Sequence, residues 1–154
     1  MSNVARGLVT GAALSVAAAG LGLGLTSAAL AEGAIAIGTS GDYAKDGFAF
    51  GAAVNKSSSD EAGATALAEC RKYEGAPTMA AICHVVFKFS HECYALSFDP
   101  KAGMPGVGWA IAGDKATAED RALKNCEVTA GPDRREFCKV NRSFCDTGLA
   151  PPSP

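Results

Sequence analysis

Six cysteines are the residues of this 154-residue sequence whose type and spacing could support chemistry most directly. A cysteine serves as a nucleophile, a metal ligand or a disulfide partner, and its surroundings select the role. The six fall into two similarly spaced pairs and one remaining pair: Cys70 with Cys83, Cys126 with Cys138, and Cys93 with Cys145. An even count in so short a chain is typical of a disulfide framework, provided that the chain leaves the reducing cytosol.

Zinc binding is the alternative role for part of this set. Cys83, His84, His91 and Cys93 carry thiolate and imidazole groups that zinc accepts as ligands. Their spacing matches no recognised finger pattern, and adjacent residues of a strand point to opposite faces. We therefore expect no metal and no cofactor, with His84 on the solvent side of a strand and His91 in a hairpin turn.

Two pairs of carboxylates, Asp60-Glu61 and Glu119-Asp120, could act as general acid and base if they faced each other across a cleft. Each pair falls in the first turn of an expected helix, where the helix dipole favours negative charge. The sequence contains no Gly-x-Ser-x-Gly elbow, no His-Glu-x-x-His and no phosphate loop. We therefore expect no catalytic residues and a protein that is not an enzyme.

Four cations, Arg134, Arg135, Lys139 and Arg142, form a polar cluster that folding alone does not explain. Guanidinium groups bind carboxylates and phosphates through parallel N–H donors, so the cluster is a candidate site for a small anion or an acidic partner. An ion pair with a helix carboxylate is the structural alternative. Because the formal net charge of the chain is −2, a nucleic-acid partner is not expected.

The first 31 residues predict a cleaved export signal. Arg6 precedes an apolar stretch over residues 8–25, and Ala29 and Ala31 place small residues where signal peptidase cuts. Cleavage would leave Glu32 as the first mature residue of a periplasmic or secreted protein without stable membrane insertion. A retained anchor is the alternative, because the apolar stretch is at the lower end of the about 17–25 residues that span a bilayer.

The elements that position these residues occur twice. Apolar alternation and alanine-rich stretches predict the order strand, strand, helix, strand over residues 33–90 and again over 93–145. Ser58 with Glu61, and Thr117 with Asp120, resemble helix caps. The expected strands are 34–37, 48–54, 84–89, 94–98, 107–111 and 139–144, and the expected helices are 58–73 and 117–126.

The doubled order also predicts how the cysteines pair. Each helix ends in a cysteine and each following strand comes after one, so Cys70–Cys83 and Cys126–Cys138 would be equivalent bridges. A third bridge, Cys93–Cys145, would then join the two units. Six cysteines allow 15 pairings, and the equivalence of the repeats favours this one.

Several short segments of glycine, alanine, aromatic and cysteine residues recur through the chain: Gly33-Ala34-Ile35-Ala36, Gly47-Phe48-Ala49-Phe50-Gly51, Cys93-Tyr94-Ala95-Leu96, Gly106-Val107-Gly108-Trp109-Ala110 and Ala122-Leu123-x-x-Cys126. Together these segments resemble the bacterial exported family known as domain of unknown function 4189. The resemblance covers residues 33–145 and implies a small exported domain; it brings no established activity and no catalytic residues.

The sequence therefore predicts an α+β domain over residues 32–146, followed by a disordered tail over 147–154. Two β-β-α-β repeats would form one sheet with two helices packed on one face, tied by disulfides. We expect a binding or inhibitor-type module whose partner is an unknown envelope or extracellular protein or ligand, bound at the helix-free sheet face or between the units. The alternatives are a small hydrolase-like enzyme and an envelope structural protein tethered by an uncleaved N-terminal segment.

Overall fold

A computed structural model describes residues 31–148 of the chain. The predicted export signal, apart from Ala31, and the last six residues of the predicted tail lie outside the described part. Thr147 and Gly148 are described, and both donate their backbone N–H to Asn55 Oδ1 at 3.0 Å. The described chain therefore continues two residues beyond the predicted end of the domain.

Both repeats have the predicted order of elements. The first contains β1 (Glu32–Gly38), α1 (Tyr43–Asp46), β2 (Ala49–Lys56), α2 (Ser59–Arg71), α3 (Pro77–Ala81) and β3 (His84–Ser90). The second contains β4 (Cys93–Phe98), β5 (Val107–Ala112), α4 (Lys115–Ala130), the 3-10 helix η1 (Arg135–Phe137) and β6 (Lys139–Cys145). The short helices α1, α3 and η1 are additions to the predicted set. Between residues 31 and 148, no helix has the length and apolar character needed to span a bilayer.

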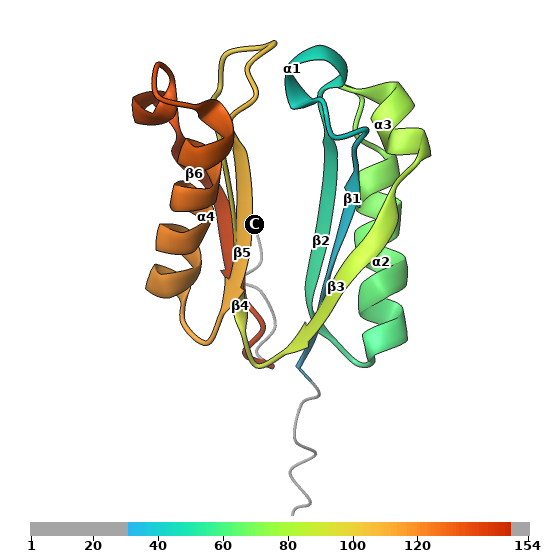
Figure 1. Cartoon of the computed structure of the whole chain (residues 1–154). Coiled ribbons are helices and arrows are strands. Elements are labelled where there is room, and N and C mark those ends of the chain that lie inside the picture. Colours follow the sequence, from blue (N-terminus) through green and yellow to red (C-terminus); the bar gives the residue numbers. More distant parts are fainter. Residues whose placement is uncertain (1–30, 149–154) are drawn as a thin grey trace, which may run out of the picture.

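The strands form two separate antiparallel sheets rather than the single sheet that the sequence predicts. The strand orders are β2-β1-β3 and β5-β4-β6, so each repeat closes its own sheet around its first strand. The α+β class and the β-β-α-β order are thus confirmed, and the single sheet is wrong. Figure 1 shows the sheets facing each other, with α2 outside one and α4 outside the other.

The distribution of side-chain size explains why the sheets stack. The faces toward the helices carry small residues such as Ala34 and Ala95, which let each helix lie close to its sheet. The opposite faces carry large apolar residues such as Ile35 and Tyr94, which pack together between the sheets. A single open sheet with both helices on one face would leave these side chains in water, at a cost of about 1.5–3 kcal/mol each. The helix-free faces therefore form a core and not the predicted contact surface.

A glycine lets each long helix touch the backbone of the strand beneath it. A Cβ atom added to Gly51 would lie 2.2 Å from the carbonyl oxygen of Ala66, and one added to Gly108 would lie 2.3 Å from that of Ala122. Gly51 and Gly108 thus approach equivalent turns of α2 and α4. The two repeats therefore pack their long helix against the sheet through the same close contact.

The helix caps differ in one detail from the prediction. Ser58 caps α2 as expected and accepts a hydrogen bond from Glu61 N–H at 3.1 Å. In α4 the cap is Asp114, which accepts from Thr117 N–H at 2.9 Å, so Thr117 lies inside the helix. A carboxylate can accept both the backbone N–H and the hydroxyl of Thr117, and this explains why the helix begins earlier.

One buried hydroxyl makes no hydrogen bond in the described part of the chain: that of Ser97 on β4. We expect Ser97→Ala to raise the free energy of unfolding by about 1 kcal/mol, because the buried hydroxyl loses its hydrogen bonds to water on folding and gains none in the protein. Ser143 on the neighbouring strand is the matched control, since its hydroxyl donates to Glu119 on α4. Urea unfolding measures both variants, and Ser143→Ala should lower the free energy of unfolding. A loss of stability for Ser97→Ala as well would contradict the conclusion that the Ser97 hydroxyl is unpaired.

Candidate functional site

All six cysteines form disulfides in the structure, and the pairs are those that the repeat predicts. Cys70–Cys83 joins the end of α2 to the start of β3. Cys126–Cys138 joins α4 to the start of β6, but α4 continues to Ala130, so Cys126 lies one turn before the helix end rather than at it as predicted. The remaining two link strands within the second sheet, where Cys93 and Cys145 lie directly opposite each other. This bridge therefore fixes β6 to β4 and does not join the two units. None of the six is a free thiol.

Within the described residues, no group of three or more His, Cys, Asp or Glu side chains is placed to hold a metal ion. The thiols considered for zinc are instead bonded to other cysteines. His84 is exposed on β3, and His91 lies in the connection between the sheets with a backbone φ of 56°.

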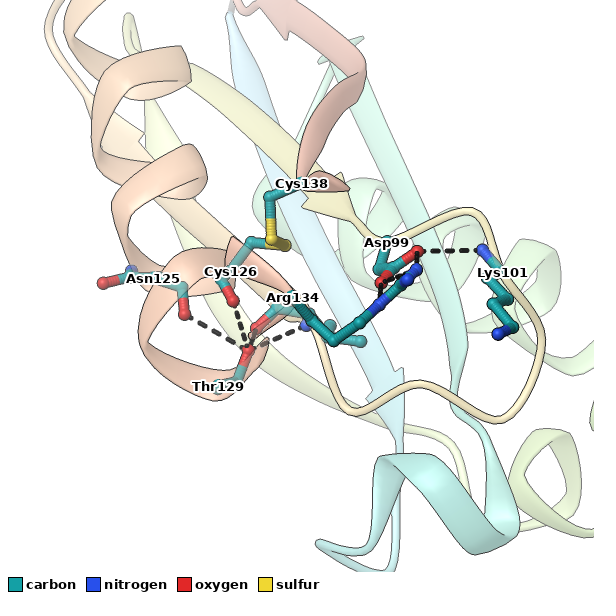
Figure 2. Close-up of a disulfide and its surroundings, with 8 residues drawn as sticks. Asp99, Lys101, Asn125, Cys126, Thr129, Arg134 and Cys138 are labelled. Atoms are coloured by element: carbon teal, nitrogen blue, oxygen red, sulfur yellow. Dashed lines mark hydrogen bonds and ion pairs between the residues drawn. A yellow bond between two sulfur atoms is a disulfide. The ribbon is translucent and has the colours of Figure 1, made fainter. Parts of the chain in front are cut away.

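Arg134, the first of the predicted binding cations, is held by a buried carboxylate. Its Nε and Nη2 atoms donate to Asp99 at 2.9 and 3.0 Å, and its guanidinium lies 3.9 Å from the centre of the Phe137 ring. Figure 2 shows this pair beside the Cys126–Cys138 disulfide. The ion pair foreseen as the structural alternative is thus formed, but its carboxylate follows a strand and is not in a helix.

Asp99 is the anchor of this arrangement. Burial raises the pKa of the Asp99 carboxyl, but the Lys101 N–H and the Arg134 guanidinium together lower it further, so the net shift is downward. The carboxylate is thereby kept ionised between the β4–β5 loop and the residues that follow α4. Arg134 has a structural role at this position.

We expect Asp99→Asn to lower the thermal midpoint by several degrees at neutral pH, because the charged pair is lost. Since the folded pKa is depressed, the stabilisation is complete above the unfolded pKa and disappears as the pH falls below about 4 toward the folded value. The thermal midpoints of the unaltered protein and of Asp99→Asn should therefore become equal as the pH is lowered from 7 to 3. The exposed Asp133→Asn is the matched control, and a gap that does not change with pH would contradict the role of the pair.

The other three cations do not gather with Arg134. Arg135 lines a shallow depression with Lys124 and Val128 of α4, whereas Arg142 lines a separate pocket against β2. Lys139 is exposed at the start of β6. The predicted cluster of Arg134, Arg135, Lys139 and Arg142 is therefore spread over different surfaces and forms no single anion site.

Sequence reasoning missed a polar clamp at the base of the two sheets. Asp146 is buried and accepts hydrogen bonds from the backbone N–H of Asn55 at 2.7 Å and of His91 at 3.2 Å. These two donors are also the non-glycine residues with positive φ in residues 31–148. Asp146 thus holds two strained turns together just after Cys145, and no local sequence signal reveals such a long-range contact.

A concave surface lies along β5, and we call it the β5 groove. It has a volume of about 670 Å³. Its inner side contains Trp109, whose ring lies 5.1 Å from that of Phe87 on β3. Its outer side is formed by α4, where Val128 is 81% exposed. The residues that define the β5 groove are Tyr43, Phe87, Val107–Ile111, Arg121, Lys124, Asn125, Val128 and Thr129.

The backbone edge of β5 is partly covered by α4. The Thr129 hydroxyl accepts from Val107 N–H at 2.8 Å and lies 2.7 Å from the Val107 carbonyl oxygen (Figure 2 shows this threonine). Asn125 Nδ2 donates to the Trp109 carbonyl at 2.9 Å. These contacts protect the first half of an edge strand and leave the second half open.

The two repeats carry different side chains at the position of the β5 groove. In the register of the shared glycines and cysteines, Trp109 corresponds to Ala52 of β2, and Val128 corresponds to Lys72. The cations also have no counterpart, because Arg121 and Lys124 correspond to Thr65 and Ala68. The corresponding groove along β2 and α2 is lined by Phe48, Phe50, Lys72 and Tyr73 and by Arg142 of β6, so both repeats have a groove at this place and its side chains differ.

The predicted acid pairs have structural partners. Asp60 pairs with Lys88 of β3, which lowers the pKa of its carboxyl. Glu61 accepts from the Ser57 hydroxyl and N–H, and these two bonds lower its pKa. In α4, Glu119 accepts from Ser143 and Asp120 pairs with Lys124 at 2.7 Å. The pairs thus stabilise the helices and are not brought together.

The fold and the site define a small disulfide-bonded α+β domain with an open groove along the edge strand β5. Comparison with known families places the chain within this class more narrowly. The chain belongs to the family described as Domain of unknown function (DUF4189), whose model matches residues 33–145. Comparisons with curated proteins and with solved structures found no match.

Proposed function

We propose that the protein is an exported binding module, without catalytic activity, that holds an envelope or extracellular protein in the β5 groove. The observation that carries the proposal is the groove itself, which joins Trp109, exposed Val128 and two cations along an unpaired strand edge. Aromatic and arginine side chains are the residues that most often dominate binding energy at interfaces.

Export is part of the proposal and is supported by two features of the chain. All six cysteines pair in the structure, and disulfides persist in oxidising compartments. The N-terminal sequence carries the pattern of a cleaved signal. N-terminal sequencing of the exported protein should find Glu32 first. A product that begins at Met1 and sediments with membranes would support the tethered alternative instead.

Photo-crosslinking in the producing cells tests the binding function. Benzoylphenylalanine placed at Val128, in the groove, should yield a defined adduct with one partner protein. The same group placed at Lys139, exposed on the opposite edge strand of the same sheet, should not yield it. The absence of an adduct from Val128, or an identical adduct from both positions, would contradict the proposal.

Binding of the crosslinked partner can then be measured through Trp109, because it is the one tryptophan in the chain. Adding the purified partner should shift Trp109 emission, and Val128→Glu should weaken the affinity about tenfold or more, because it would bury a carboxylate where the partner meets an apolar side chain. Lys139→Glu serves as the control. Equal affinities for the two variants would place the binding surface elsewhere.

A further inference from the structure

We propose that the β5 groove binds an extended polypeptide segment that joins the sheet as a strand next to β5, with alternating apolar and acidic side chains. This inference rests on the proposed binding function and specifies the chemistry of the ligand. It is argued from three features of the groove: its free backbone groups, its two unlike walls and its cations.

The free backbone groups lie in the second half of β5. Val107 and Trp109 direct backbone groups toward α4, away from β4. Because the backbone groups of a strand alternate between its two edges, those of Ile111 also point away from β4, toward the free edge of β5. The Trp109 N–H and both backbone groups of Ile111 have no hydrogen-bond partner in the described chain. An extended segment could pair with these three groups, which is how strand addition gives affinity.

The two walls of the groove differ in chemistry. Trp109 and Phe87 form an apolar wall on the inner side of β5. Arg121 and Lys124 stand on the other side, on α4. Because successive side chains of an added strand point to opposite faces, one set would meet the aromatic wall and the other would meet the cations. The geometry therefore selects a segment in which apolar residues alternate with carboxylates.

Charge favours acidic residues on the α4 side. Arg121 has no ion-pair partner among residues 31–148, and neither does Arg135, which shares a depression with Lys124. Lys124 is paired with Asp120, and Glu127 also borders that depression. The two unpaired guanidiniums thus provide charge for a partner, since an arginine binds a carboxylate through two parallel N–H donors.

The direct test uses the oxidised protein and the peptide acetyl-(Val-Glu)₃-amide, with Trp109 emission as the readout. We expect this peptide to bind and acetyl-(Val-Lys)₃-amide to bind about tenfold more weakly or not at all. N-methylation of the peptide at alternate positions tests strand pairing, because a methyl group blocks the N–H of one edge only. Methylation of one alternate set should weaken binding about tenfold, and methylation of the other should leave it unchanged.

A variant of the protein gives the reciprocal test. Ile111→Pro removes an outward N–H that the β4–β5 ladder does not use, which an edge strand tolerates. Ile111→Val keeps the N–H and the apolar wall. We expect the proline variant to lose peptide binding and the valine variant to keep it, with far-UV circular dichroism unchanged in both. If the proline variant unfolds, the methylated peptides on the unaltered protein still decide.

The outcomes separate the two proposals. Equal effects of both methylation sets, or equal affinity for the acidic and basic peptides, would overturn strand addition by an acidic segment. Failure of the acidic peptide to bind while a Val128 crosslink to a partner persists would overturn the ligand chemistry and leave the binding function standing. Absence of the crosslink together with tight peptide binding would support the groove and contradict the cellular partner.

Discussion

Gly108→Ala is expected to destabilise the protein by about 3 kcal/mol, although it adds a single methyl group. The added Cβ would lie 2.2 Å from Cys126 N and 2.3 Å from the Ala122 carbonyl oxygen. Both contacts are with helix backbone, so the new atom can be accommodated only if α4 moves away from β5. That movement would also separate Asn125 and Thr129 from the strand edge that they cover.

Urea unfolding of three variants checks this prediction. Gly51→Ala should cost a similar amount, since its Cβ would meet the corresponding atoms of α2. Gly113→Ala is the matched control, because a Cβ there meets nothing within 4 Å, and its effect should stay within about 0.5 kcal/mol. A Gly108→Ala variant as stable as Gly113→Ala would show that the helix does not lie directly on the strand.

Removal of the Cys93–Cys145 disulfide is expected to have the largest effect among the three bridges. This bond closes a sequence separation of 52 residues, compared with 13 and 12 for the other two. Loop-closure entropy then predicts a loss of about 4 kcal/mol for Cys93→Ala/Cys145→Ala, and about 3 kcal/mol for each short-loop pair. The long loop also contains β5 and α4, so the cost falls on the repeat that forms the groove.

The three double-alanine variants should be compared by denaturant unfolding, with Asp146→Asn as a further variant that weakens the neighbouring clamp without touching sulfur. We expect Cys93→Ala/Cys145→Ala to unfold at the lowest denaturant concentration of the three. A smaller loss than for Cys70→Ala/Cys83→Ala would mean that the neighbouring hydrogen bonds of Asp146, and not the disulfide, hold this end of the domain together.

The sequence was sufficient to predict the elements that depend on local signals. The duplicated order, the capping serine of α2 and the cysteine spacing come from patterns within a few residues, and the structure contains each of them. The stacking of the sheets was also encoded, because Ala34 and Ala36 alternate with Ile35 and Ile37. The large apolar residues on the face away from the helices must be buried from water, and the second sheet buries them.

The candidate site could not be predicted in the same way. Arg134 is adjacent in sequence to Arg135, yet the former is held by Asp99 and the latter lies beside Lys124. The β5 groove combines residues from four separate elements, and the contact between Phe87 and Trp109 depends on how the two sheets stack. Single-sequence patterns contain little information on such contacts, because they are set by tertiary packing rather than by local spacing.

The central claim is that the open half of β5 is the recognition element, and residue-resolved amide hydrogen exchange tests it most directly. In the free protein, the amides of Trp109 and Ile111 should exchange quickly, while those of Gly108 and Ala110 are protected by the ladder with β4. Addition of the bound peptide should slow the two fast amides and leave those of β2 unchanged. Binding without a change at Trp109 and Ile111, or equal protection of all four amides in the free protein, would contradict the claim.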